Sequence, residues 1–267
     1  MNRLDAKVAL ISGGARGIGG ATATAMAQAG AKVVIGDVLD DAGKATVEAI
    51  NAAGGQAKYI HLDVAKEADW QAAVDLATSS WSGLDILVNN AGLFLGRDFE
   101  EVSVADWERL VSVNLTGVWL GTKMCAPALR EAGQKSPAGS AIVNLASIAG
   151  LVGSQLDPLY SMTKGGVTTF TKSTALAFGR KGDRIRVNSI HPGVIETDRG
   201  AQTFVARAGQ IGTNDSNAAR EQSLRMHPIG RLGTADDIAK GIVYLASDDA
   251  GFMTGAGLVV DGGYTAQ

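Results

Sequence analysis

The chain has 267 residues and a formal net charge of −3; 46% of its residues are hydrophobic and 35 are glycine. This composition excludes a disordered chain, and the acidic balance without a basic segment argues against nucleic acid as a partner. Apolar runs such as residues 8–11 are too short for a membrane span or a signal-peptide core, so we expect a cytoplasmic protein with no membrane partner.

Short apolar runs alternate along the chain with longer amphipathic stretches. The runs predict strands at residues 7–12, 32–37, 56–62, 84–89, 141–145, 185–190 and 258–261. The stretches predict helices at residues 17–29, 42–53, 66–81, 104–132 and 158–179, the fourth interrupted near Asn114. This alternation predicts a doubly wound α/β fold, Rossmann-type, with a mainly parallel seven-stranded sheet. No composition break marks a second domain, so residues 1–267 are expected to form a single dinucleotide-binding and catalytic domain.

One segment, residues 196–232, is rich in Gly, Asn, Ser and Arg and follows the sixth predicted strand. Loops at this place in an open α/β sheet cover the ligand crevice. We therefore expect a long substrate loop that behaves as a lid, with a surface insertion of no function as the alternative.

A glycine-rich turn joins the first predicted strand to the first predicted helix. Gly13, Gly17 and Gly19 have the spacing G-x-x-x-G-x-G, with Arg16 and Ile18 between them. Glycines at this position allow a tight turn and allow backbone N–H groups to approach a pyrophosphate at the helix N-terminus. The turn predicts a dinucleotide site, one residue different in spacing from the commonest fingerprint, although a purely structural turn remains possible.

Asp37 ends the second predicted strand, eighteen residues after Gly19. A carboxylate there can accept hydrogen bonds from the adenosine ribose hydroxyls and would repel a 2′-phosphate. This predicts NAD(H) in preference to NADP(H). Arg16 is the contrary signal because it could reach a phosphate, and capping of the following turn is the structural alternative for Asp37.

Tyr160 and Lys164 lie four residues apart and so share one face of a helix, and Ser147 precedes Tyr160 by thirteen residues. With a dinucleotide bound at the glycine turn, Tyr160 could exchange a proton while the cofactor exchanges a hydride. A tyrosine is a poor base because its ordinary pKa is about 10. A nearby Lys164 ammonium and a positive nicotinamide would lower that pKa, and Ser147 would hydrogen-bond the substrate oxygen.

These motifs together resemble the short-chain dehydrogenase/reductase superfamily, in its compact single-domain group, over essentially the whole chain. The matching pieces are the turn at 13–19, Asp63-Val64, Asn89-Asn90-Ala91-Gly92, Asn114, Ser147, Tyr160-x-x-x-Lys164, Pro192-Gly193 and Thr197. The resemblance implies the strand order 3-2-1-4-5-6-7 and a homotetramer.

The resemblance also implies roles for single residues. Asp63 and Val64 would contact the adenine, while Asn90, Ala91 and Gly92 would form the turn beneath the cofactor. Pro192, Gly193 and Val194 would line the nicotinamide, Thr197 would bond its carboxamide, and Lys164 would hold its ribose. The backbone of Asn114 would bind a water that relays protons from Lys164; a helix kink with a satisfied amide is the structural alternative, and both can hold.

The remaining reactive side chains give little indication of chemistry. His61, His191 and His227 have no Cys or His partner at metal-ligand spacing, so no catalytic metal is expected. His227 lies in the long segment and could contact substrate, although a solvated side chain is the simpler expectation. Cys125, the one cysteine, lies in an apolar stretch and is expected to be buried and inert.

The function that these residues favour is reversible NAD(H)-dependent interconversion of a secondary alcohol and a ketone. The expected pocket residues are mostly apolar and suggest a hydrophobic or cyclic substrate rather than a sugar or hydroxy acid: Leu93, Ala149, Leu151, Gln155 and Leu156. Alternatives are a hydroxysteroid dehydrogenase and a 3-oxoacyl carrier-protein reductase. A cofactor-sensing binding protein is a non-enzymatic alternative, and it would be expected to lack Ser147, Tyr160 or Lys164.

Overall fold

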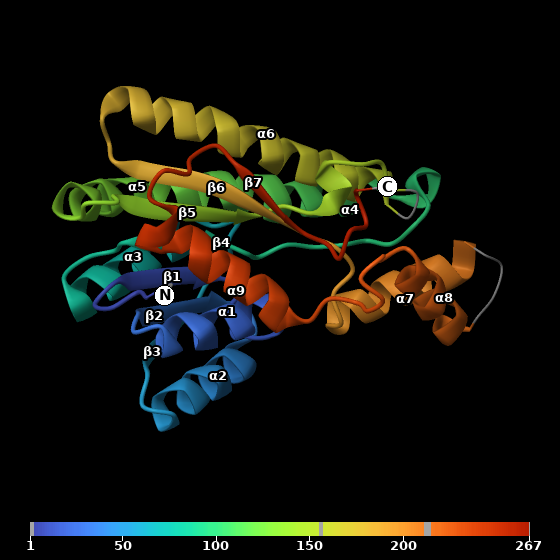
Figure 1. The fold of residues 1–267 in the computed structure, drawn as a ribbon, viewed down its shortest axis with the longest axis horizontal. Coiled ribbons are helices and arrows are strands. Elements are labelled where there is room, and N and C mark those ends of the chain that lie inside the picture. The colour runs from blue at the N-terminus through green and yellow to red at the C-terminus, as the bar shows by residue number, and fades with distance from the viewer. Residues whose placement is uncertain (1–2, 155–156, 211–214, 267) are drawn as a thin grey trace.

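A parallel seven-stranded sheet forms the centre of the computed structural model, which describes residues 3–154, 157–210 and 215–266 (Figure 1). The strand order is β3-β2-β1-β4-β5-β6-β7, and every neighbouring pair is parallel. The strands are β1 (Val8–Ser12), β2 (Lys32–Asp37), β3 (Gln56–His61), β4 (Ile86–Asn89), β5 (Ser140–Leu145), β6 (Ile185–Pro192) and β7 (Gly257–Val260). The predicted fold class and strand order are thus confirmed.

Helices cover both faces of the sheet, which is why its strands are apolar on both sides. In β1, Ala9 and Ile11 belong to the core beneath α1, α2 and α9, whereas Val8 and Leu10 belong to the core beneath α3, α5 and α6. The helices are α1 (Gly17–Gln28), α2 (Asp40–Ala52), α3 (Glu67–Trp81), α4 (Val104–Val111), α5 (Gly117–Lys135), α6 (Pro158–Lys181), α7 (Asp198–Gln210), α8 (Ser216–Arg225) and α9 (Ala235–Ala246).

The interruption predicted near Asn114 is a π-helical turn, Ser112–Thr116, that joins α4 to α5. A wider turn of this kind is frequent at functional sites. The turn rotates Asn114 fully into the interior, where its side chain is completely buried.

The expectation of a loop at residues 196–232 is wrong. Two helices, α7 and α8, occupy most of this segment and pack against each other through Phe204, Ala208 and Ala219 (Figure 1, right). Residues 211–214 lie outside the described part of the chain.

The helix α9 was not predicted at all. It begins with a capping box in which Thr234 and Asp237 satisfy each other's backbone N–H groups, and it buries Ile238 and Ile242 against α1 and the sheet. Within the described residues, no helix combines the length and the apolar character needed to cross a lipid bilayer.

Candidate active site

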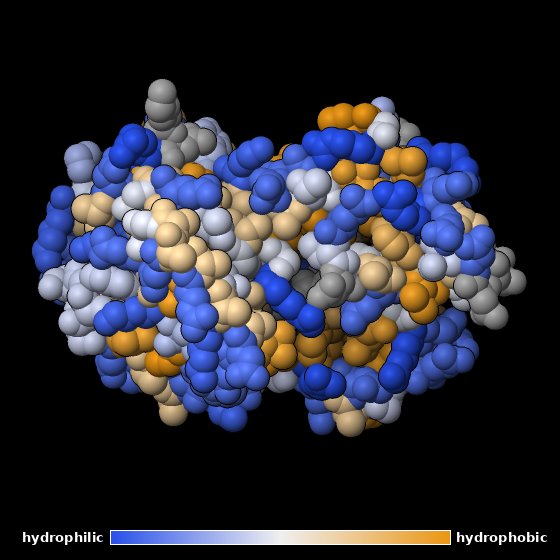
Figure 2. All heavy atoms as spheres, turned by 90° about the horizontal axis from the view of Figure 1, so that it is seen from below, coloured by the Kyte–Doolittle hydropathy of each residue, from blue (hydrophilic) through white to orange (hydrophobic). Residues whose placement is uncertain are grey.

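A cleft of about 890 Å³ opens at the carboxyl ends of the strands, between the sheet and the helix α7. Figure 2 shows the surface hollowed between the main body and the part on the right that carries α7 and α8, with hydrophobic side chains inside the hollow. Predicted cofactor residues that line the cleft are Gly13, Arg16, Gly17, Ile18, Gly19, Asp37, Asp63, Val64, Asn90, Ala91, Gly92, Tyr160, Pro192, Gly193, Val194 and Thr197. The structure therefore brings together every predicted cofactor residue except Lys164, which is buried behind the cleft wall.

Two positions of the glycine turn, Gly13 and Gly19, leave no room for a side chain. Gly13 has φ +65°, and a Cβ there would lie 2.8 Å from the Cα of Ala91. A Cβ on Gly19 would collide with the carbonyl oxygen of Gly13. The Asn90 amide donates to that same carbonyl at 2.7 Å and fixes the turn against β4. Gly13 and Gly19 are thus required by close packing within the turn and against the chain after β4, and the turn lines the cleft at the N-terminus of α1, where a pyrophosphate would bind.

Asp37 ends β2 with its carboxylate held in place. Its Oδ2 accepts from the N–H of Ala15 and its Oδ1 from the N–H of Leu39, each at 3.0 Å. A carboxylate offers about four acceptor sites, so two bonds leave capacity for the hydroxyls of a ribose. The capping alternative for Asp37 and the ribose prediction are therefore compatible.

At the end of the cleft that is expected to hold the adenine, the Asp63 carboxylate accepts a hydrogen bond from the N–H of Ala65. The N–H of Asp63 donates to the carboxylate of Asp69. At the opposite end, the Thr197 hydroxyl accepts from the N–H of Gly200 and caps the first turn of α7. The roles of both side chains toward a cofactor stay predictions.

The three predicted reacting side chains converge on one end of the cleft. Lys164 is 1% exposed, donates from Nζ to the carbonyl of Leu145 at 2.6 Å, and places Nζ 5.6 Å from the Tyr160 ring centroid. Ser147 follows β5, and its hydroxyl accepts from the N–H of Ala149 at 3.1 Å. Tyr160 and Ser147 line the same cleft as residues 192–194, and the nicotinamide role of that segment stays a prediction.

Asn114 contacts the rest of the site through its side chain. Its Oδ1 accepts from the N–H of Leu93 at 2.7 Å, and its Nδ2 donates to the carbonyl of Leu93 and to Thr163. Thr163 precedes Lys164 on α6. The satisfied amide and the helix distortion of the structural alternative are both present, and the backbone relay stays a prediction.

A second buried carboxylate, Asp157, was missed by the sequence analysis. Its Oδ1 accepts from the N–H of Tyr160 at the start of α6, and its Oδ2 accepts from the N–H groups of Leu95 and Gly96 at 3.0 and 3.1 Å. The ring of Phe94 meets that of Tyr160 edge to face at 5.4 Å. The loop after β4 and the N-terminus of the Tyr160 helix are therefore tied together. An Asp directly before a Pro that begins a helix is a capping signal that could have revealed this.

Two histidines are buried next to the cleft, and both ring nitrogens of each are hydrogen-bonded within the protein. His191 donates from Nδ1 to the carbonyl of Ser147 at 3.1 Å, and its Nε2 pairs with the Ser189 hydroxyl at 2.9 Å. His227 donates from Nδ1 to the carbonyl of Ser223, and its Nε2 accepts from the N–H of Val194. The expectation that His227 is solvated is wrong, because it is 3% exposed.

The side chains of Leu93 and Ala149 line the cleft as expected, and Phe94, Leu95 and Tyr264 join them. Leu151 is outside the cleft and 46% exposed, because its side chain turns to the surface after the turn at Ile148–Gly150. Gln155 and Leu156 lie outside the described residues.

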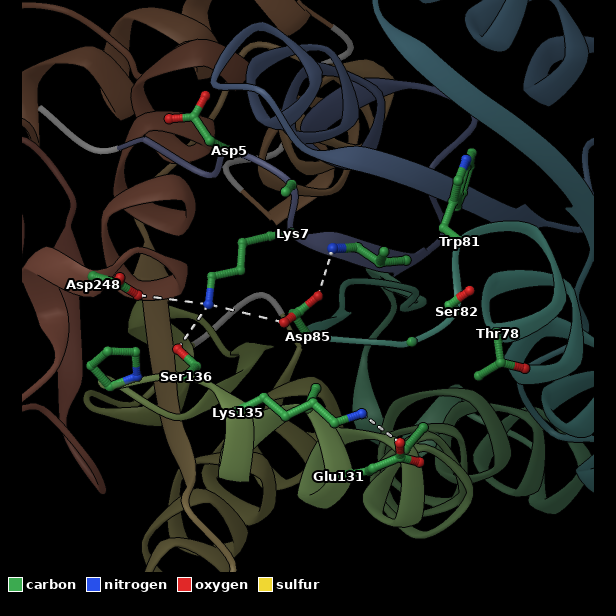
Figure 3. A pocket seen from close by; sticks show the side chains of 16 residues that line it. Asp5, Lys7, Thr78, Trp81, Ser82, Asp85, Glu131, Lys135, Ser136 and Asp248 are labelled. Carbon is green, nitrogen blue, oxygen red and sulfur yellow. Dashed lines mark hydrogen bonds and ion pairs between the residues drawn. The ribbon is translucent and has the colours of Figure 1, made fainter.

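A second pocket, of about 520 Å³, lies at the opposite edge of the sheet (Figure 3). Lys7 extends into it and contacts Ser136 at 2.9 Å, with Asp85 and Asp248 each at 3.9 Å. None of the predicted site residues lines this pocket.

Cys125 lies elsewhere, fully buried, and burial raises the pKa of its thiol well above the ordinary range, as an inert cysteine requires. No cluster of His, Cys, Asp or Glu suited to a metal ion occurs among the described residues.

The fold and the glycine turn define a dinucleotide-binding protein of the doubly wound class. Residues 13–265 match the family model described as enoyl-(acyl carrier protein) reductase. A solved short-chain type dehydrogenase/reductase from Mycobacterium marinum superposes with a TM-score of 0.86 at 30% identity, covering 100% of this chain and 98% of that chain.

Curated relatives agree. The chain is 42% identical to a 3-alpha-(or 20-beta)-hydroxysteroid dehydrogenase of Mycobacterium tuberculosis, over 99% of this chain and 91% of the relative. It is 40% identical to the trans-4-hydroxycyclohexanecarboxylate dehydrogenase of Sinomonas cyclohexanicum, over 99% and 95%. The chain belongs to the short-chain dehydrogenase/reductase family and is an oxidoreductase that acts on CH–OH groups with a nicotinamide cofactor.

Proposed function

We propose that the protein interconverts a cyclic secondary alcohol and its ketone with NAD(H). The observation that carries this proposal is the meeting of Tyr160, Lys164 and Ser147 at the end of the cleft where Pro192 to Val194 lie. The cofactor fits the residues present, because the turn at Gly13 to Gly19 lines the cleft at the N-terminus of α1, where backbone N–H groups can meet a pyrophosphate. The nicotinamide of a cofactor held there would supply a hydride acceptor for the carbinol carbon.

The residues of the chain perform the proton transfer. Tyr160 as its phenolate takes the proton of the substrate hydroxyl during oxidation and becomes a phenol, and the phenol donates that proton to the carbonyl oxygen during reduction. The buried Lys164 ammonium stabilises the negative charge that develops on the phenol oxygen. Ser147 donates to the substrate oxygen and so holds the carbinol against Tyr160. His191 holds the backbone of Ser147 in place through its carbonyl.

NAD(H) is proposed in preference to NADP(H) because Asp37 lies at the end of β2 with spare acceptor capacity. A 2′-phosphate beside this carboxylate would meet a like charge. Arg16 also lines the cleft and is the residue that would oppose this preference.

The cyclic substrate is supported by the apolar wall of Leu93, Phe94 and Leu95 and by the relatives, whose names specify ring alcohols. A hydroxysteroid is the second candidate, favoured by the 42% identical relative. A 3-oxoacyl carrier-protein reductase is disfavoured by Asp37 and by the acidic charge balance of the chain.

We also propose that α7 and α8 act as a substrate lid, that the chain assembles as a homotetramer, and that it works in the cytoplasm. The lid proposal is supported by the cleft-lining residues of α7, and the tetramer by exposed apolar side chains on α6.

The test is oxidation of cyclohexanol and of hydroxysteroids with NAD⁺, followed as NADH absorbance, in the wild type and in Tyr160→Phe. The variant loses only the phenol oxygen, so it should fold, bind NADH, and keep less than about a tenth of wild-type kcat. A variant with near-wild-type kcat contradicts the role of Tyr160. A wild type that oxidises no ring alcohol contradicts the proposed substrate class.

A further inference from the structure

Arg207 lies in the last turn of α7 and differs from Arg186, the other buried arginine among the described residues, whose guanidinium donates to the carbonyl oxygens of Ala138, Leu245 and Ser247. Arg130, Arg220 and Arg231 are partly exposed, and each pairs with a carboxylate. Arg207 is only 8% exposed and, among the described residues, has no carboxylate within ion-pair distance. Its Nη1 contacts the thioether sulfur of Met226 at 2.7 Å, and its buried Nε has no hydrogen-bond partner in the described part of the chain.

A buried guanidinium in this state is costly. A thioether is a weak acceptor and does not replace the water that burial removes from a charged group. A buried charge normally has a partner of opposite charge. The arrangement therefore suits an anionic partner that arrives from the cleft, onto which Arg207 opens.

The position of Arg207 places that partner at the substrate end of the cleft. Gly200, Thr203 and Arg207 line the cleft from one face of α7, because they are spaced by three and four residues. Gly200 lies beside Thr197 at the cofactor end. Arg207 is seven residues further, about 10 Å along the helix axis.

The neighbours of Arg207 point to the same end. The adjacent Ala206 lies against the loop after β4, where its Cβ would be 3.1 Å from a Cβ on Gly96. The same loop carries Phe94, which packs on Tyr160. The glycine turn, where the cofactor phosphates are expected, is at the other end of α7.

We infer that Arg207 binds a carboxylate on the substrate, so that the substrate class is a hydroxylated alicyclic carboxylate. This inference rests on the proposed function. The carbinol lies at Ser147 and Tyr160, the ring lies between the apolar residues of the loop after β4, and the acid lies at the guanidinium. Arginine is suited to this task because its planar fork matches a carboxylate with two parallel hydrogen bonds.

The experiment compares five alcohols: cyclohexanol, the cis and trans isomers of 4-hydroxycyclohexanecarboxylate, and the methyl ester of each isomer. The wild type should use one acid isomer with a kcat/KM about ten- to a hundredfold above that of its ester, the range expected for a charge-assisted contact. Arg207→Gln should remove this preference and leave kcat/KM for cyclohexanol within about threefold. Arg207→Lys keeps the positive charge but loses the planar guanidinium, so this variant should show only part of the wild-type preference for the acid over its ester.

Arg225→Gln is the matched control, because it removes the same charge from an exposed position on α8 that does not line the cleft. It should keep the wild-type preference for the acid. Equal use of acid and ester by the wild type, or a lost preference in the control as well, overturns the inference.

Two further measurements separate the remaining explanations. If Arg207→Gln weakens NADH binding by tenfold or more while the preference for the acid persists, Arg207 serves a cofactor phosphate and the inference is wrong. Cyclohexanecarboxylate, which has no hydroxyl, should raise the thermal midpoint of the wild type with NADH bound, and its methyl ester should not. This binding measurement needs no turnover and no folded variant. Absence of any ring-alcohol oxidation then rejects the proposed function, whereas absence of the carboxylate effect rejects the role of Arg207.

Discussion

Asp37 is the residue on which the proposed cofactor preference depends. Its carboxylate is fixed by the N–H groups of Ala15 and Leu39, so it cannot swing away to admit a phosphate without losing both bonds. The sequence predicted its place at the end of a strand; the structure adds that its orientation is imposed by the backbone.

Asp37→Ala should therefore lower the ratio of kcat/KM for NAD⁺ to that for NADP⁺ by at least about tenfold, since the mutation removes both the ribose acceptor and the repulsion of the 2′-phosphate. The measurement is steady-state kinetics with both cofactors in wild type and variant. A wild type that already prefers NADP⁺ would show that Arg16 outweighs Asp37.

His191 makes the stability of the fold depend on pH. Burial lowers the pKa of its imidazole below the ordinary 6.5; the bond to the Ser147 carbonyl opposes this, and Lys164 and Lys172 add to it. The unfolded chain therefore binds the proton first. The stability that His191 contributes is present above pH 6.5 and is lost as the pH falls from 6.5 toward the lowered pKa.

Thermal unfolding between pH 7.5 and 5 should show this loss. Each unit of lowered pKa corresponds to about 1.4 kcal/mol, or about 2–4 °C in Tm for a chain of this size. His191→Gln keeps a donor and an acceptor but cannot titrate, so its Tm should fall less steeply below pH 6.5. Parallel Tm curves for the two proteins would count against this account of His191.

Among single residues, those that stand at a recognisable spacing could be predicted from the sequence. Those whose role depends on being buried could not. Tyr160, Lys164 and Asp37 stand in patterns tied to secondary structure. Arg207 and His227 stand in no pattern; only the packing of α7 and α8 shows that both are buried and that Arg207 opens onto the cleft.

Among the elements, α7 and α8 are the candidates for motion. They pack mainly on each other through a small core of their own, around Phe204 and Ala219. Such a pair can move away from the sheet without exposing the main core, as a lid must.

We expect backbone amides of residues 198–210 and 216–225 to exchange at least about tenfold faster in the free protein than in the ternary complex with NADH and a ring ketone. The amides of the glycine turn should respond to NADH alone and serve as the internal reference. Residues 211–214, between the two helices, lie outside the described residues. Equal protection of both helices in the free and ternary states would indicate a rigid wall.

The same helices show where prediction of the elements fails. Their sequence is rich in residues that also suit loops; α8 has only a weak apolar period, whereas α7 has a clear one that the sequence analysis overlooked. The helix α9 was predictable in principle. Thr234 and Asp237 have the spacing of a capping box, and Ile238, Ile242 and Leu245 follow at helical intervals.

For the whole molecule, the alternation of strands and helices was enough to predict a mainly parallel sheet, because parallel strands need crossover connections, whereas the strand order was predicted only through the resemblance to the family. Assembly is a separate question. On α6, the outermost helix at the top of Figure 1, Met162 and Leu176 are 62% and 59% exposed. Exposed apolar side chains on a long helix suit contact with a second copy of the chain.

Leu176→Glu should therefore convert the proposed tetramer into smaller species, because a carboxylate in an apolar interface loses its hydration without gaining a partner. Light scattering coupled to size exclusion measures the mass directly. Phe99→Glu, at another exposed apolar side chain, is the control and should keep the mass. A monomeric wild type would contradict the tetramer outright.

The loop after β4 has a consequence for how this protein can acquire new substrates. Asn114 holds it at the N–H and carbonyl of Leu93, and Asp157 holds it at the N–H groups of Leu95 and Gly96. All of these hydrogen bonds are made to backbone N–H or C=O groups of the loop. Every residue type has both groups, except that proline lacks the N–H. The side chains of Leu93 and Leu95 can therefore be exchanged, in evolution or by design, while the helix that carries Tyr160 keeps its alignment, whereas Phe94 also packs on the Tyr160 ring. The residues that select the substrate can therefore change without a change in the residues that carry out the reaction, although both sets line the same cleft.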